Sequence, residues 1–113
     1  MPRPSAEAKS AFQALVPVHS AVTMRPMFGN LAAFVNGNMF LALFGSDVAV
    51  RLADEDRAEL LAEEGASLFA PMPGRAMKEY VVVPPAWRDR PDRVVSWVDR
   101  SLAWTASLPP KKR

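Results

Sequence analysis

The chain has 113 residues, half of them hydrophobic, no cysteine and a formal net charge of +2. A chain of this length forms one domain with one core, and the lack of cysteine excludes disulfides, thiolate metal ligands and cysteine nucleophiles. No apolar run approaches the roughly 20 residues of a membrane span, and residues 1–10 lack an apolar signal core. We therefore expect one cytoplasmic domain over residues 1–113, with flexible tails at 1–4 and 109–113 and no membrane contact.

The first predicted element is an amphipathic helix that follows Ser5, a suitable N-cap. Apolar residues then recur at helical spacing until Pro17 ends the run. The single histidine, His19, lies in the connection to the next element. A catalytic base needs an orienting partner and a nucleophile within reach, and the sequence nominates neither. His19 is therefore predicted to be a loop residue.

Three short apolar runs in the first half of the chain carry most of its strand signal, at residues 31–35, 39–44 and 48–52. Asn36-Gly37 separates the first two runs and suits the positive φ angles of a type I′ turn. Gly45-Ser46-Asp47 separates the second run from the third. The spacing predicts an antiparallel meander of three strands.

The segments around the meander are less regular. Residues 22–27 are predicted to form an initial strand or an extended lead-in, because Pro26 removes one backbone donor and suits an edge. Phe28-Gly29-Asn30 is predicted to turn the chain, and its alternative is a contact with a small ligand or another backbone. Residues 39–44 are apolar on both faces, so this run is expected to be the central strand or to contact a second copy of the chain.

The second half of the chain predicts two helices with two strands between them. Asp54-Glu55-Asp56 opens the first of these helices, where acidic side chains complement the helix dipole better than they form a metal site. Strands are predicted at 67–70 and 77–83, and the last helix begins near Asp89. Trp97 and Trp104 on that helix are interpreted as packing residues rather than as platforms for bases. The resulting fold class is α+β, a two-layer sandwich of order α-β-β-β-α-β-β-α with an antiparallel sheet and helices on one face.

A small cationic patch is the candidate binding site at the level of residues. Arg75 and Lys78 flank the start of the strand at 77–83, and Arg25 and Arg51 join them if they lie on the same side. The alternative is scattered surface charge. The C-terminal Lys111-Lys112-Arg113 adds three positive charges, for which solubility is the simpler interpretation.

Many positions, in order, closely resemble the TfoX N-terminal domain family over nearly the whole chain. They are Arg25, Met27-Phe28-Gly29, Phe34, Gly37, Met39-Phe40, Asp47, Val50-Arg51, Phe69, Met77, Tyr80, Pro84 and Trp97. The resemblance implies a two-layer α+β sandwich, in agreement with the elements above. It also implies a stand-alone N-terminal domain, because competence regulators of this family continue into a second, helical domain.

The resemblance implies a regulatory or adaptor role without catalysis, cofactor or metal, since members named for the family are thought to act as coactivators in natural competence. The implied partner is a protein of the transcription machinery or another copy of the chain, bound through the sheet and the Phe28-Gly29 turn. Two alternatives stay open. One is direct nucleic-acid binding through Arg25, Arg51, Arg75, Lys78 and the basic tail. The other is a small-molecule binder or enzyme with an apolar pocket.

Overall fold

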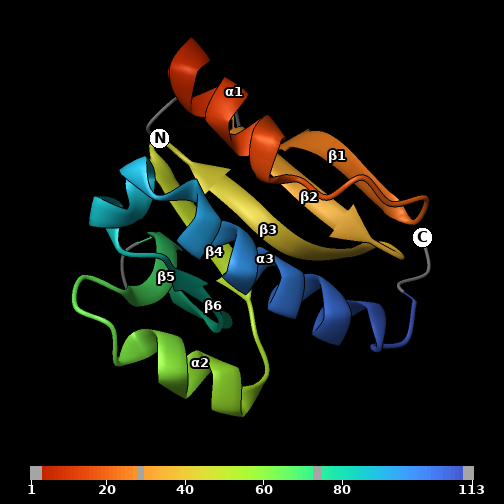
Figure 1. Cartoon of the computed structure of the whole chain (residues 1–113). Coiled ribbons are helices and arrows are strands. Elements are labelled where there is room, and N and C mark those ends of the chain that lie inside the picture. Colours follow the sequence, from red (N-terminus) through yellow and green to blue (C-terminus); the bar gives the residue numbers. More distant parts are fainter. Residues whose placement is uncertain (1–3, 28–29, 73–74, 111–113) are drawn as a thin grey trace.

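The computed structural model describes residues 4–27, 30–72 and 75–110 (Figure 1). The elements in chain order are α1 (Ala6–Leu15), β1 (Val22–Met27), β2 (Asn30–Val35), β3 (Asn38–Phe44), β4 (Asp47–Arg51), α2 (Asp54–Leu61), β5 (Ser67–Met72), β6 (Arg75–Val82), the 3-10 helix η1 (Pro85–Asp89) and α3 (Pro91–Ala106). None of the helices in these ranges is long and apolar enough to cross a membrane.

The strands form one antiparallel sheet of six strands in the order β1-β2-β3-β4-β6-β5. The predicted α+β class and the antiparallel sheet are confirmed. The sheet has one more strand than the predicted order, because residues 22–27 form a full strand rather than a lead-in. β1 pairs with β2 along its whole length, from Val22 opposite Val35 to Met27 opposite Asn30. Pro26 lies on this edge strand, where a missing donor leaves the sheet interior intact.

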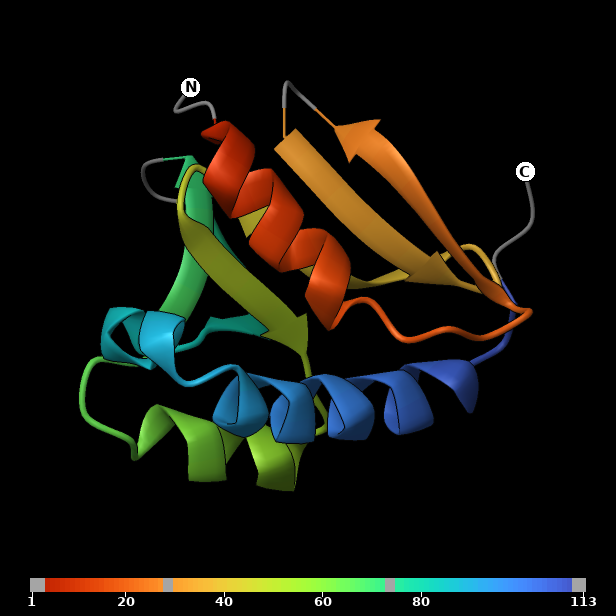
Figure 2. The same cartoon turned by 45° about the horizontal axis from the view of Figure 1, so that its top comes forward.

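The helices contribute to one layer on one face of the sheet. Phe12 of α1, Leu60 of α2 and Val98 of α3 are buried in the same cluster as the strand side chains of that face. Figure 2 shows α1 crossing in front of the strands and α3 running below them in that view. The Ser5 hydroxyl accepts a hydrogen bond from the amide of Ala8 at 3.0 Å, so the predicted N-cap of α1 is confirmed.

β3 is an interior strand, as one of its two predicted placements required, and a β-bulge interrupts its pairing with β2. The bulge leaves Phe40 as the extra residue on β3, and such residues lose ladder hydrogen bonds. Two hydroxyls bond the carbonyls at this point. Tyr80 of β6 donates to the carbonyl of Met39 at 2.9 Å, and Ser101 of α3 donates to the carbonyl of Phe40 at 2.8 Å. The bulge is therefore stabilised by side chains from β6 and from the helix layer.

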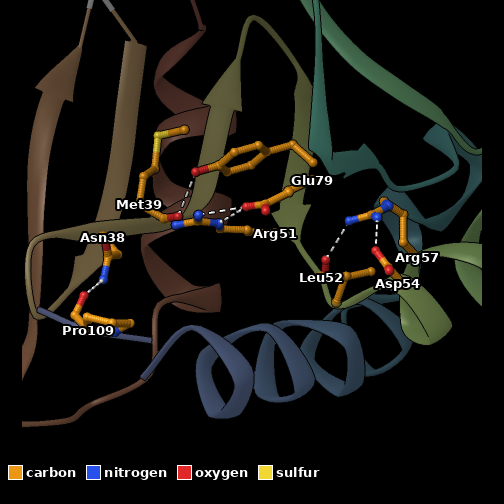
Figure 3. A network of polar contacts seen from close by, with 9 residues as sticks. Asn38, Met39, Arg51, Leu52, Asp54, Arg57, Glu79 and Pro109 are labelled. Atoms are coloured by element: carbon orange, nitrogen blue, oxygen red, sulfur yellow. Dashed lines mark hydrogen bonds and ion pairs between the residues drawn. The ribbon is translucent and has the colours of Figure 1, made fainter. Parts of the chain in front are cut away.

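The C-terminal end of the described chain is tied to the sheet. The side-chain amide of Asn38 donates to the carbonyl of Pro109 at 3.0 Å (Figure 3). Asn38 is the first residue of β3, and Pro109 is the residue at which a flexible tail is expected to begin, so this contact ties the start of that segment to the sheet. Residues 111–113, which carry the three basic charges of that tail, lie outside the described residues.

Candidate interaction surface

Arg51, at the end of β4, is held by several neighbours. Its Nε and one Nη lie 2.7 and 2.6 Å from a carboxylate oxygen of Glu79 on β6 (Figure 3). Its guanidinium carbon lies 5.7 Å from the ring centroids of both Tyr80 and Trp104, within the range of a cation–π contact. These contacts link β4, β6 and α3. Arg51 is thus a structural tether, with part of its donor capacity already used.

Among the neighbours of Arg51, Tyr80 has a shifted pKa. Burial raises the pKa of the Tyr80 hydroxyl above its ordinary value. The nearby Arg51 charge lowers this pKa and the Glu79 charge raises it, but burial has the largest effect. The hydroxyl therefore stays protonated at neutral pH and can donate to the Met39 carbonyl.

The other cationic residues of the predicted patch lie on strands other than β4. Arg25 is exposed on edge strand β1, 5.4 Å from the ring centroid of Phe34. The strand register places Arg25 and Arg51 on the same face of the sheet. β2 and β3 lie between their strands, so β1 and β4 are about 14 Å apart at about 4.8 Å per strand. Lys78 is exposed on β6. The side chain of Arg75, and Phe28 and Gly29, lie outside the described residues.

Ion pairs join carboxylates of α2, and of the residues just after it, to the arginines of α3, a role that the sequence analysis missed. Arg100 lies 3.4 Å from Asp56 and 2.9 Å from Glu59, and Arg93 lies 3.6 Å from Glu63. Each arginine also stands 4.3 Å from the ring centroid of a tryptophan. The acidic cluster at the start of α2 thus helps to dock one helix on another, and several positive charges of the chain are neutralised locally.

The face of the sheet opposite the helices is a second, smaller core. Phe69 makes edge contacts with Phe44 and Tyr80, at centroid distances of 5.7 and 6.5 Å. Phe34, Phe44 and Met77 are half-buried at the margin of this cluster. The floor consists of three alanines with exposed fractions of 0, 4 and 1%, namely Ala32, Ala42 and Ala49. The face expected to bind a partner is therefore largely filled by the protein's own side chains.

An apolar cleft of about 370 Å³ lies between α1 and η1, where β3 turns into β4. Its floor includes the core residues Phe12, Leu43 and Trp87. Ala8 and Ala11, one turn apart on α1, form part of its wall. Because alanine ends at Cβ, this stretch of the wall projects little into the space. Both α1 and η1 lie in the helix layer (Figure 2).

The rim of the cleft is polar and mostly negative. Arg88 of η1 donates to the hydroxyl of Ser46 at 3.2 Å. The carboxylates of Glu7, Asp47 and Asp89 line the same opening, so three negative groups face one positive group. All five side chains are exposed. The cleft therefore combines an apolar floor with a negatively charged rim.

The model of the TfoX N-terminal domain matches residues 13–104, which is most of the chain. The chain belongs to the TfoX N-terminal domain family. A search of curated proteins finds no match.

The TfoX N-terminal domain match does not cover the whole cleft. The floor residues Leu43 and Trp87 and the rim residue Arg88 lie inside the matched range. Of the lining residues on α1, Leu15 lies inside this range and those up to Phe12 precede it. Sequence reasoning did not find this cleft. The one available signal was the small size of Ala8 and Ala11, which has meaning only once η1 is known to lie opposite them.

Proposed function

We propose that this protein is a non-catalytic regulatory module that binds a protein partner in the cleft between α1 and η1. Membership of the TfoX N-terminal domain family supports a regulatory role, and the competence regulators of that family suggest transcription as the process. The observation that carries the proposal is the cleft of about 370 Å³ with an apolar floor. The absence of cysteine is compatible with a reducing cytoplasm, where the proposal places the protein.

The distribution of charge favours a protein partner over nucleic acid. Arg51, Arg93 and Arg100 each pair with a carboxylate, so their positive charge is already balanced. Non-specific affinity for DNA comes mainly from cationic side chains that replace the counterions of phosphates. The cleft itself has a negative rim, which would repel a phosphate backbone. Its titratable groups stand at the exposed rim rather than inside, which supports binding rather than catalysis.

The proposal is tested by restoring the gene in a deletion strain and measuring transcript levels. Ala11→Phe places a ring in the cleft, and Ala14→Phe places the same ring on the exposed surface of α1 away from it. We expect Ala14→Phe to restore the wild-type transcript profile and Ala11→Phe to fail. Equal protein levels and melting temperatures must accompany the comparison. Full restoration by Ala11→Phe would refute the binding site, and an unchanged profile in the deletion strain would refute the regulatory role.

Direct DNA binding is the competing function, and its salt dependence separates it from the proposal. A fluorescent duplex is titrated with the full chain and with a chain truncated before Lys111, at about 50 and 200 mM salt. Three phosphate contacts from the tail predict a slope of roughly −2.7 and about a 40-fold loss of affinity over that range. A steeper slope that survives truncation would place DNA binding on the folded domain and would contradict the proposal.

A further inference from the structure

We infer that the cleft recognises a short peptide segment that presents one large apolar side chain next to a lysine or arginine. The inference rests on the proposed function and specifies the chemistry of its partner. Its two parts come from independent features of the cleft, the apolar floor and the charge of the rim.

The floor indicates a single apolar anchor. Phe12, Leu43 and Trp87 are buried core residues, with exposed fractions of 1, 2 and 6%, and they also border the cleft. The volume of about 370 Å³ is near the lower end of the roughly 300–1,000 Å³ that is typical of ligand sites. Such a space suits one or two large side chains better than a whole helix. Interface hot spots are commonly large side chains of this kind that fill a desolvated pocket.

The rim indicates a basic neighbour for that anchor. Glu7 lies in the first turn of α1, Asp47 begins β4 and Asp89 ends η1, so carboxylates from three elements line the opening. Among the described residues, Arg88 is the only cationic side chain that lines it. Within the part of the chain that the structure describes, Arg88 makes no ion pair and contacts the Ser46 hydroxyl instead. A basic side chain would be attracted to this rim and an acidic one repelled. Exposed charges of this sort affect selectivity and association rate more than affinity.

The first experiment selects binders from a displayed library of random peptides on the immobilised full-length protein. We expect the retained peptides to share a large apolar residue with a lysine or arginine within a few positions. The best peptide is then labelled and titrated into the variants. Ala11→Phe should lower its affinity at least tenfold, and Ala14→Phe should leave it unchanged. Trp87 lies at the floor, so binding should also change the tryptophan fluorescence.

The second experiment tests the charge of the rim. Asp47→Asn and Asp89→Asn each remove one exposed carboxylate from the opening, and Glu64→Gln removes an exposed carboxylate that does not line it. An exposed ion pair contributes about 0.2–1 kcal/mol, so each rim variant should bind the basic peptide with an affinity lower by up to about fivefold. The same peptide with glutamine in place of its basic residue should bind all of these proteins equally. Glu64→Gln should have no effect on either peptide.

The outcomes separate this inference from the proposed function. Peptides that need the cleft but lack basic residues, or that carry acidic ones, would overturn the inference and leave the proposed function standing. Retention of small apolar molecules with no enriched peptide would also overturn it. Normal regulation in cells by Ala11→Phe would overturn the proposed function, and the inference with it.

Discussion

Replacing Tyr80 with phenylalanine removes one hydroxyl and leaves the ring that contacts Phe69 in place. The hydroxyl donates to the Met39 carbonyl at 2.9 Å in a buried position. A neutral hydrogen bond contributes about 0.5–1.5 kcal/mol, and a buried group left without a partner costs about 1–3 kcal/mol. We therefore expect Tyr80→Phe to lower the free energy of unfolding by about 1–2 kcal/mol. Urea unfolding at neutral pH measures this change, and the Tm should fall by roughly 4–8 °C per kcal/mol.

The same variant should also change the dependence of stability on pH. The pKa of Tyr80 is raised in the folded protein, so its proton is held more tightly there than in the unfolded chain, where the pKa is about 10. The stabilising contribution is fully present below about pH 10 and is lost as the pH rises through the folded pKa. The free energy of unfolding of the wild type should fall above pH 10 more steeply than that of Tyr80→Phe. The chain has one tyrosine, so the ultraviolet absorbance of tyrosinate reports this group alone.

Ser101→Ala provides the matched comparison, because Ser101 bonds the neighbouring carbonyl of Phe40 from the helix layer. We expect Ser101→Ala to lower the free energy of unfolding by about 1 kcal/mol. The variant with both substitutions shows whether the two hydrogen bonds stabilise the bulge independently. An unchanged urea midpoint for Tyr80→Phe would refute the assigned hydrogen bond. Tyrosinate that forms at or below the ordinary pKa in the folded protein would refute the effect of burial.

Three further substitutions test the turns and the tether at Arg51. Gly65 has a φ of +92°, and a Cβ there would lie 3.3 Å from the Cβ of Pro84, so Gly65→Ala should cost about 1–2 kcal/mol in thermal unfolding. An unchanged Tm would contradict this. The side-chain oxygen of Asn30 accepts a buried hydrogen bond from the Gly45 amide at 2.8 Å. Asn30→Ala should therefore lower the free energy of unfolding by about 1–3 kcal/mol and accelerate hydrogen exchange at that amide. Arg51→Lys should cost about 1 kcal/mol by urea unfolding, because lysine lacks the planar fork; equal stability would show that a point charge suffices.

The turn between β2 and β3 shows why much of the fold was predictable. Asn36 and Gly37 have φ angles of +53° and +83°, as a type I′ turn requires, and these two residue types tolerate such angles. The start of α1 at Ser5 was predictable for a similar reason, since a cap depends on the next three residues. β1 was only an alternative in the sequence, because Pro26 weakens the local signal and the pairing with β2 decides its conformation.

The candidate surface was less predictable. Phe28, Gly29 and the side chain of Arg75 lie outside the described residues, so their proposed roles stay predictions. Arg25 and Arg51 were predicted to join one patch if they lie on the same side; the register places them on the same face of the sheet, with two strands between them. That separation follows from the strand order, and charge composition carries no information about it.

The sequence by itself determined the elements whose signals act between near neighbours, which are the helix cap, the tight turns and the apolar periodicities. Only the tertiary structure decided what faces what. Arg51 meets Glu79 and Trp104 because β4 pairs with β6 and α3 crosses the sheet. Ala11 borders a cleft because η1, more than 70 residues later, lies opposite it. Such contacts depend on packing between distant segments, and that packing is a property of the whole fold.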